Sequence, residues 1–282
     1  MSVTQPADET PTAPEHGHRG ERAQDTTVGE VELTHWHGRI GHWMASFARW
    51  LADTVGPYGT LLLTLAIGAA IAGLLSVGAV LVYDAVTDQD GVAGIDRPLL
   101  DAILTIRDPE VDGWITSLTD LAGTVGMPLI AIAALLILSI RRRSWTPVVL
   151  IVAAGGGALL MTIAGKELIG RERPPLSDAV PPYELSASFP SGHTLNAVAI
   201  LGVIAYLLVL RRQSNAARAA IIAVAVIATI FVAGSRVYLG HHWVTDVIAG
   251  WALGAAWLAL VITAHRLYLT SRLRHDEHRA VA

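Results

Sequence analysis

Six long apolar runs constrain what this chain can fold into more than any other feature of its sequence. They lie at about 60–83, 114–140, 146–165, 194–210, 217–234 and 247–264. A helix rises about 1.5 Å per residue, so about 20 apolar residues cross a hydrocarbon layer about 30 Å thick. Charged residues make up only 16% of the 282 residues, whereas soluble domains carry about 25%. The sequence therefore predicts an all-α polytopic integral membrane protein, built as a six-helix transmembrane bundle.

Both ends of the chain are expected to lie outside this membrane domain, which we place at 57–266. Residues 1–32 are polar and rich in Pro, Thr and Glu, which predicts a disordered cytoplasmic tail, and residues 267–282 form a second cytoplasmic tail. The segment 33–56 carries large apolar residues at helical spacing. They are Trp36, Ile40, Trp43, Phe47 and Trp50. Such a stripe is typical of an interfacial amphipathic helix in the headgroup layer, or of a helix that packs against the bundle.

Basic residues indicate the orientation, because cytoplasmic loops of membrane proteins carry an excess of Lys and Arg. Arginines cluster at 141–143, 211–218 and 266–279, after the second, fourth and sixth runs. An even number of spans then places both termini in the cytoplasm and the acidic loop 84–113 outside the cell. Apolar residues between Leu99 and Leu104 recur at helical spacing in this loop. They predict a short amphipathic helix in the first outer loop.

Four basic residues break this charge rule, and all four lie at predicted outer ends of spans. They are Lys166, Arg171, Arg173 and Arg236, and Lys166 is the single lysine of the sequence. A charge at a membrane boundary is expensive and often marks a functional site. The violation is confined to one region, which indicates a site on the outer face.

The composition argues against several other kinds of site. The chain has no cysteine, so disulfides, thiolate nucleophiles and cysteine metal sites are absent. A net charge of -4 gives no reason to expect a nucleic-acid partner. The tail histidines form two His-x-His units, at 16–18 and 35–37, which we interpret as solvated side chains in preference to a metal site. No metal and no cofactor are predicted.

Three short polar motifs stand out at the predicted outer ends of the spans. The first is KELIGRERP at 166–174, the second FPSGHT at 189–194 and the third SRVYLGHHWVTD at 235–246. The first leaves the third span, the second enters the fourth, and the third joins the fifth to the sixth. All three are therefore expected at the outer face and can converge in one pocket. The loop 175–188 is expected to border that pocket.

The three motifs are similar to the signature of the type 2 phosphatidic acid phosphatase superfamily, also called PAP2 or vanadium haloperoxidase-like. Its pattern is K-x6-RP, then PSGH, then SR-x5-H-x3-D, and every fixed position is matched in order. The resemblance covers about 60–264. It implies that five residues bind a substrate phosphate and that three are catalytic. The phosphate-binding residues are Lys166, Arg173, Ser191, Gly192 and Arg236; the catalytic residues are His242, His193 and Asp246.

These roles agree with the chemistry of the side chains. Arginine can bind two phosphate oxygens in a fork, lysine acts as a point charge, and amides at a helix start attract anions. His242 is the expected nucleophile, and Asp246, four residues later on the same helix face, orients its ring. His193 is the expected general acid. His241 lies five residues from Asp246 and is given a substrate contact or a merely polar role.

The sequence thus predicts a metal-independent membrane phosphatase with its active site on the extracytoplasmic side of the cell membrane. Through a phosphohistidine it would hydrolyse a lipid phosphate or pyrophosphate, such as undecaprenyl pyrophosphate, phosphatidic acid or phosphatidylglycerol phosphate. A lipid phosphotransferase would use the same intermediate. A vanadate haloperoxidase fits less well, because those relatives are soluble, and a non-enzymatic transporter or scaffold gives no reason for the acid, base and cation set. The motifs choose neither the lipid nor the oligomeric state.

Overall fold

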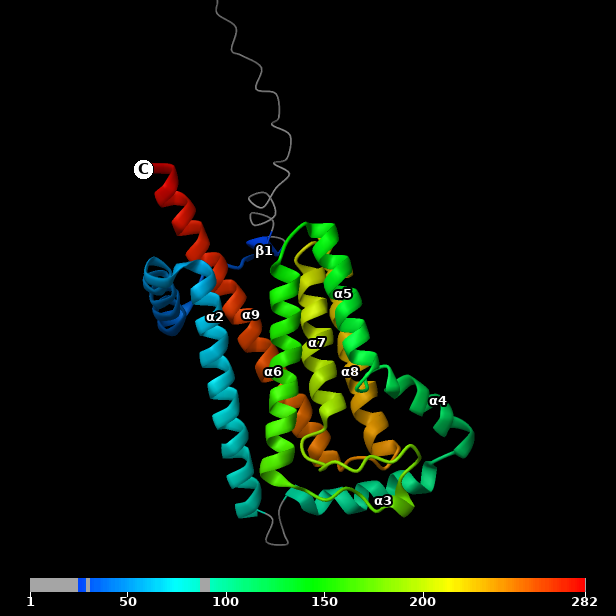
Figure 1. Ribbon diagram of the computed structural model, residues 1–282. Helices are drawn as coiled ribbons and strands as arrows, with labels where there is room; N and C mark the ends of the chain where they lie inside the picture. Colours follow the sequence, from blue (N-terminus) through cyan, green and yellow to red (C-terminus); the bar gives the residue numbers. More distant parts are fainter. Residues whose placement is uncertain (1–24, 29–30, 87–91, 282) are drawn as a thin grey trace, which may run out of the picture.

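The computed structural model describes residues 25–28, 31–86 and 92–281, and the predicted tail up to residue 24 lies outside the described residues. The described chain is mostly helical (Figure 1). Its elements are β1 (Thr27–Val28), β2 (Val31–Glu32), α2 (Gly38–Val86), η1 (Val92–Ile95), α3 (Asp96–Ile106), α4 (Pro109–Asp120), α5 (Gly126–Arg142), α6 (Thr146–Ile169), η2 (Leu176–Asp178), α7 (Gly192–Val209), α8 (Asn215–Tyr238) and α9 (Val244–Val281).

Among the described residues, four helices are long and apolar enough to cross a membrane. They are Thr146–Ile169, Gly192–Val209, Asn215–Tyr238 and Val244–Arg272, which correspond to the last four predicted runs. On α8 the side chains of Val224, Ile227 and Ile230 are 67%, 65% and 58% exposed. An aliphatic face of this kind is unfavourable in water and suits contact with lipid. The prediction of a multi-pass helical membrane protein is confirmed by these helices.

Helix α7 lies at the centre of the bundle, in contact with α6, α8 and α9 (Figure 1). Leu195, Ala199, Val203 and Leu207 recur every four residues along α7 and are fully buried. On α9, two glycines face α7. A Cβ atom at Gly250 would lie 2.8 Å from the Ser191 carbonyl oxygen, and one at Gly254 would lie 2.9 Å from that of Leu195. Small residues thus allow the two helices to approach closely near the start of α7.

The predicted span 114–140 is wrong as a single helix. The structure divides it into α4, which ends at Asp120, and α5, which begins at Gly126. A Cβ atom at Gly126 would overlap the backbone of Asp120 and Leu121, so glycine permits the tight turn between the helices. Pro128 follows in the first turn of α5, where a missing amide hydrogen costs nothing. The 17 residues of α5 extend for about 25 Å.

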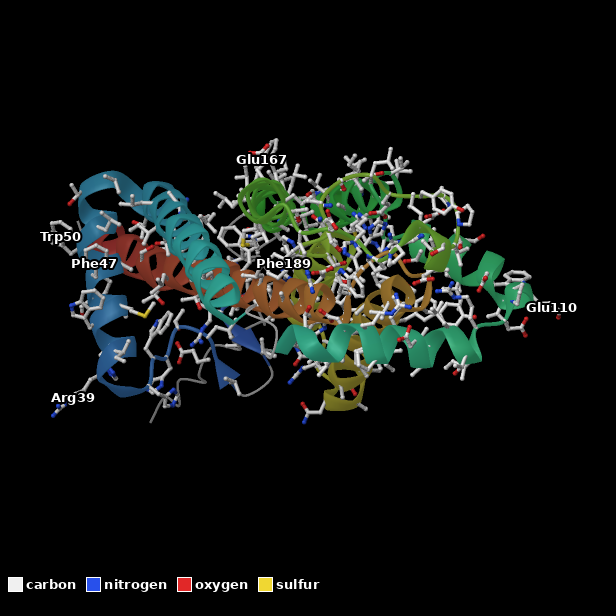
Figure 2. All side chains as sticks on the ribbon, turned by 90° about the horizontal axis from the view of Figure 1, so that it is seen from below. Arg39, Phe47, Trp50, Glu110, Glu167 and Phe189 are labelled. Atoms are coloured by element: carbon white, nitrogen blue, oxygen red, sulfur yellow. The ribbon has the colours of Figure 1, made fainter. Side chains whose placement is uncertain are left out.

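The predicted span 60–83 belongs to α2, whose 49 residues include a kink at Gly56 with φ 76° and ψ 167°. Positive φ is a region that favours glycine. Before the kink the helix runs across the bundle axis, and after it the helix runs along the bundle (Figures 1 and 2). The six-helix count stays a prediction, because it depends on the second part of α2 and on α5.

The aromatic stripe of the segment 33–56 does not pack on the bundle. The side chains of Ile40, Trp43 and Trp50 are 76%, 67% and 62% exposed. Trp43 stacks on Phe47 with 5.7 Å between the ring centroids. Phe47 and Trp50 point away from the other helices in Figure 2. Trp36 is the exception, because its Nε1 donates a hydrogen bond of 3.0 Å to Thr270 Oγ1 on α9.

The predicted amphipathic helix of the first outer loop is present as α3, with Leu100 only 1% exposed. It lies across the end of the bundle at which α6 ends and α7 begins (Figure 1), and we call this the α3 end. Near the opposite end, β1 and β2 pair Thr27 with Glu32 and Val28 with Val31. The predicted disorder therefore does not extend to residue 32.

Candidate active site

The three sequence motifs meet at the α3 end. Lys166 lies in the last turn of α6, His193 in the first turn of α7, Arg236 in the last turn of α8 and Asp246 in the first turn of α9. Arg173 lies in the segment that follows α6. In Figure 2, which looks onto this end, nitrogen and oxygen atoms gather between the helices. The ends of four helices thus bring together residues that are up to 80 positions apart.

One carboxylate connects the two arginines of the motifs. Arg173 Nη2 lies 2.7 Å from Glu184 Oε2, and Arg236 Nη2 forms an ion pair with Glu184 Oε1. Two imidazoles flank the same group, with His193 Nδ1 3.8 Å from Oε1 and His242 Nε2 4.0 Å from Oε2. The Arg236 side chain is 2% exposed and that of Glu184 is 27% exposed. An anion at this position is therefore surrounded by two guanidinium groups and two rings.

Lys166 and Arg173 also donate hydrogen bonds to the loop before α7. Lys166 Nζ donates to Ser186 Oγ and to the Ala187 carbonyl oxygen, both at 2.7 Å. Arg173 Nε donates to the Ser186 carbonyl oxygen at 2.6 Å, and Arg173 Nη1 donates to that of His241 at 2.5 Å. The expected position of the loop 175–188 beside the motifs is observed.

The His242 ring lies between an aspartate and an arginine. Its Nδ1 is 3.5 Å from Asp246 Oδ2, and its Nε2 is 3.2 Å from Arg173 Nη1. Asp246 Oδ2 also accepts hydrogen bonds from Ser188 Oγ at 2.5 Å and from the Trp243 amide at 3.0 Å. The His242 side chain is 1% exposed and that of Asp246 is buried. The spacing predicted that His242 and Asp246 share a helix face. This prediction is wrong, because α9 begins after His242.

A second set of bonds fixes the other oxygen of Asp246. Arg171 Nη1 lies 2.5 Å from Asp246 Oδ1, and Arg171 Nη2 lies 2.6 Å from Asp96 Oδ2 on α3. Asp96 also accepts hydrogen bonds from the Thr245 amide at 3.0 Å and from Thr245 Oγ1 at 2.7 Å. Arg171 thus connects α3 to the first turn of α9.

The start of α7 holds the second motif. Ser191 takes the N-cap position, but its Oγ lies 3.0 Å from Thr194 Oγ1 and makes no bond to a backbone amide. A Cβ atom at Gly192 would lie 2.9 Å from Thr162 Cγ2, so glycine lets α7 begin close to α6. A Cβ atom at Gly123 would lie 3.3 Å from His193 Nε2. The turn between α4 and α5 therefore lies directly beside this histidine.

The His241 ring contacts the loop before α7. Its Nε2 lies 2.6 Å from the Val180 carbonyl oxygen, and the Val180 amide donates to the Leu239 carbonyl oxygen at 2.9 Å. Burial lowers the pKa of His241, the nearby Arg236 charge lowers it further, and the bond to Val180 opposes this change. His241 therefore anchors the beginning of the loop.

Burial and charge set the protonation of the two groups at the centre. Burial disfavours the charged form of Glu184, but the charges of Arg236 and Arg173 outweigh it and lower the pKa to about 2. Burial lowers the pKa of His242 to about 4; the hydrogen bond to Asp246 opposes the change, and the Arg173 charge adds to it. At neutral pH, Glu184 is a carboxylate and the His242 ring is neutral.

Sequence reasoning missed Glu184, Ser188 and Asp96, because none of them belongs to a matched motif. Asp96 comes 150 positions before Asp246, and no spacing rule joins them. The sequence marks Arg171 as one of four basic residues that break the charge rule and as a possible substrate contact, but it gives no reason to pair it with Asp96 or Asp246. Those unbalanced positive charges were the one available signal that carboxylates had to lie nearby.

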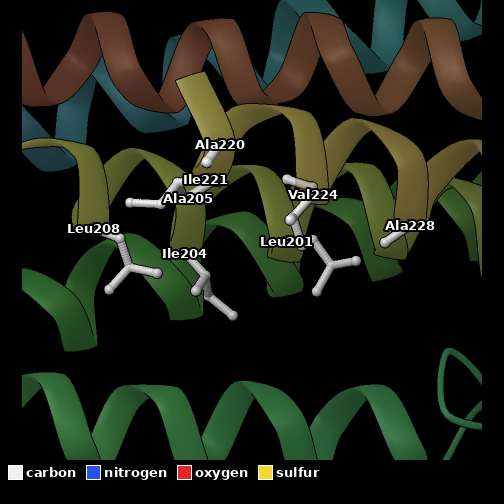
Figure 3. A pocket seen from close by; sticks show the side chains of 9 residues that line it. Leu201, Ile204, Ala205, Leu208, Ala220, Ile221, Val224 and Ala228 are labelled. Carbon is white, nitrogen blue, oxygen red and sulfur yellow. The ribbon is translucent and has the colours of Figure 1, made fainter. Parts of the chain in front are cut away.

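A groove elsewhere in the protein belongs to the lipid-facing surface. It has a volume of about 340 Å³ and is lined by α7 and α8 (Figure 3). Its lining consists of Leu201, Ile204, Ala205, Leu208, Ala220, Ile221, Val224, Ala225 and Ala228. No motif residue contributes to it, and its aliphatic side chains offer nothing to an anion.

The segment that contains the three motifs matches a known protein family. Residues 144–268, which contain all three motifs, match the PAP2 superfamily. The chain is 36% identical over 184 residues to phosphatidylglycerophosphatase B of Bacillus subtilis (strain 168), and the match covers 64% of this chain and 88% of that protein. This chain belongs to the PAP2 superfamily. The predicted resemblance to PAP2-type membrane phosphatases is thereby confirmed for family and enzyme class.

The fold agrees with this PAP2 membership. The crystal structure of a transmembrane PAP2-type phosphatidylglycerolphosphate phosphatase from Bacillus subtilis is similar, with a TM-score of 0.60 and 29% sequence identity. The similarity covers 67% of this chain and 93% of that chain. It extends beyond the motifs, because the share covered exceeds the residues 144–268 that match the family.

Proposed function

We propose that this PAP2 protein hydrolyses a lipid phosphate or pyrophosphate through a phosphohistidine at His242. The observation that carries the proposal is the arrangement of Arg173, Arg236, His193 and His242 around a single anionic group. Phosphoryl transfer depends mainly on positioning and on stabilising charge at the equatorial oxygens. Side-chain cations in this arrangement supply that stabilisation, which supports a metal-independent reaction.

The phosphate is held by groups from three helix ends. Arg173 and Arg236 bind its oxygens in forks, and Lys166 adds a point charge. Ser191 and Gly192 lie at the start of α7, where a helix attracts anions. The Ser191 amide already donates to the Asp246 carbonyl oxygen at 3.1 Å, so Ser191 is proposed to meet the phosphate through its hydroxyl and Gly192 through its amide. These are the five phosphate-binding residues that the family resemblance implied.

Two histidines divide the proton transfers. His242 Nε2, which faces the arginines, attacks phosphorus while its Nδ1–H donates to Asp246. The bond between phosphorus and the leaving oxygen breaks, and His193 gives its proton to that oxygen. In the second step His193 takes a proton from water, the water oxygen attacks phosphorus, and the bond from phosphorus to His242 Nε2 breaks. Asp246 stabilises the imidazolium that exists between the steps.

The substrate is proposed to be a lipid whose headgroup lies at the depth of the helix ends, with its tails in the bilayer. The Bacillus subtilis relatives are named for phosphatidylglycerophosphate, which supports phosphatidylglycerol phosphate as the first candidate. Phosphatidic acid and undecaprenyl pyrophosphate remain the alternatives that contain the same phosphate chemistry.

The membrane arrangement follows from charge and exposure. The arginine clusters at 141–143 and 211–218 lie at the end opposite α3, which supports a cytoplasmic position for that end and for both termini. The α3 end and the site then face the extracytoplasmic side. Six crossings result if the second part of α2 and the 17-residue α5 both span. The exposed aromatic stripe before Gly56 supports an interfacial position for that segment.

The test is phosphate release by purified full-length protein from the three candidate lipids. Wild type should release free phosphate, and phosphatidylglycerol phosphate should be cleaved most efficiently. His242→Ala should lower release by at least about a thousandfold, because a missing nucleophile leaves only charge stabilisation. His37→Ala changes an exposed histidine outside the site and should leave the rate unchanged. Phosphate release that survives in His242→Ala contradicts the assignment of His242 as the nucleophile. Transfer of the phosphate to a lipid alcohol, without release of free phosphate, indicates a phosphotransferase.

A further inference from the structure

Glu184 occupies the position proposed for the substrate phosphate. Each of its four neighbours, Arg173, Arg236, His193 and His242, belongs to the proposed machinery. The two carboxylate oxygens divide these neighbours between them, as two oxygens of a phosphoryl group would. Guanidinium groups bind carboxylate and phosphate with the same fork geometry.

The two anions cannot occupy this position together. A phosphate at the arginines would place two further negative charges beside the carboxylate, in surroundings where Arg236 is 2% exposed. Like charges this close repel strongly when they are shielded from water. Binding of substrate therefore requires that Glu184 leave the arginines.

Protonation does not release the carboxylate under ordinary conditions. Although burial favours the neutral acid, Arg236 and Arg173 hold the pKa of Glu184 near 2. The group thus stays charged at any pH near neutrality, and only a competing anion or a movement of the loop can displace it.

The loop gives Glu184 a route out. Its ends are fixed, since the Val180 amide bonds to Leu239 at 2.9 Å and the Ser188 amide bonds to Arg171 at 2.8 Å. Between these anchors no regular secondary structure is present. Leu185, the next residue, is 90% exposed, and the Glu184 side chain itself is 27% exposed. A rotation of this side chain toward solvent breaks its ion pairs with both arginines without moving the anchors, while Arg173 keeps its bonds to the Ser186 and His241 carbonyl oxygens.

We propose that Glu184 is an intramolecular competitor that holds the phosphate site when no substrate is bound and determines which anions can enter. This inference rests on the proposed function of the same site. A phosphate monoester with two charges attracts the arginines more strongly than the single charge of Glu184 and replaces it. A phosphodiester, with one charge, has no such advantage. Glu184 thereby protects the site from the phosphodiester headgroups of the surrounding bilayer.

The experiment compares full-length wild type with Glu184→Gln, which keeps the shape, and Glu184→Ala, which removes the group. The matched control is Glu167→Gln, which makes the same charge change at an exposed residue next to Lys166 that points away from the bundle (Figure 2). Inhibition of 4-nitrophenyl phosphate hydrolysis is measured with inorganic phosphate and with a short-chain phosphatidylglycerol. Variants that hydrolyse too slowly are titrated with inorganic phosphate by calorimetry.

Both Glu184 variants should bind inorganic phosphate about tenfold more tightly than wild type, equivalent to about 1.4 kcal/mol. Inhibition by phosphatidylglycerol should strengthen by at least the same factor, and Glu167→Gln should match wild type within twofold. Unchanged or weaker phosphate binding in both variants overturns the proposal and assigns Glu184 to substrate binding or to structure. A wild type that neither releases phosphate nor binds it contradicts the proposed function itself, and the competitor role with it.

Discussion

Arg171 should contribute to the catalytic rate although it touches no part of the proposed phosphate site. The change Arg171→Ala removes the group that joins Asp246 to Asp96. The Arg171 side chain is 11% exposed, and those of Asp96 and Asp246 are 4% and 0% exposed. Breaking a buried ion pair costs about 3–5 kcal/mol, because the remaining charge stays buried without a partner. Asp246 keeps its bonds from Ser188 and Trp243, so we expect a loss of stability of about 3 kcal/mol.

The effect on catalysis follows from the position of Asp246. Without Arg171 one oxygen of this carboxylate loses its partner, and Asp246 no longer holds the His242 ring in one orientation. We expect kcat to fall about 10- to 100-fold, equivalent to about 1.4–2.7 kcal/mol of barrier, while KM for the substrate changes little. Both quantities are measured on purified protein in detergent, together with the midpoint of thermal unfolding.

Arg97, which follows Asp96 in the sequence, provides the control for the loss of an arginine. Arg97 is 52% exposed and pairs with Asp101 at 2.7 Å and Asp178 at 2.9 Å. Exposed ion pairs contribute less than about 1 kcal/mol, so Arg97→Ala should retain wild-type kcat. Asp96→Asn should reproduce part of the Arg171 effect, and the double variant should lose less than the sum, since the two residues act through one contact. A kcat within twofold of wild type in Arg171→Ala refutes the positioning argument.

Three further outcomes are expected. The pKa of His242, about 4, lies below the ordinary value of about 6.5, so the stability that the neutral ring contributes is complete above pH 6.5 and is lost as pH falls toward 4. The His242 NMR signal, assigned as the wild-type signal that His242→Ala lacks, should titrate near pH 4. A midpoint near 6.5 contradicts burial of a neutral ring. Chelation with EDTA should leave phosphate release unchanged, because side-chain cations stabilise the charge; loss that magnesium restores is the opposing result. In this cysteine-free chain, Leu185→Cys should react with a membrane-impermeant maleimide on intact cells while Gln213→Cys, in the loop between α7 and α8, should not; the reverse pattern places the site in the cytoplasm.

The positions of the motif residues followed from the sequence because helix ends are set by the lengths of apolar runs. Lys166, His193 and Arg236 each lie within one turn of a helix end, and the count of spans assigned those ends to one side. The break between α4 and α5 was not anticipated, since the apolar run continues through it. Its glycines and proline were available as signals, but such residues also occur inside membrane helices.

The contacts of the loop before α7 could not be read from the sequence. Glu184 and Ser188 have no periodicity, and their partners come from the segment after α6 and from the ends of α7, α8 and α9. The Arg171–Asp96 bond joins α3 to the segment after α6, a contact that depends on how the loop 84–113 folds back. Local patterns determine helices, whereas polar contacts between loops require the packed arrangement.

The two glycines of α9 that face α7 mark a side of α9 that accepts few substitutions, opposite a side that accepts many. A methyl group at Gly250 or Gly254 would meet the backbone of α7 and push away the helix that carries Asp246. On the outward side, Ile248 is 56% exposed and meets no such limit. Tolerance to mutation along α9 should therefore rise and fall every three to four positions. Substitutions at lipid-facing positions should leave the site in place, whereas a side chain at either glycine should move Asp246 away from His242.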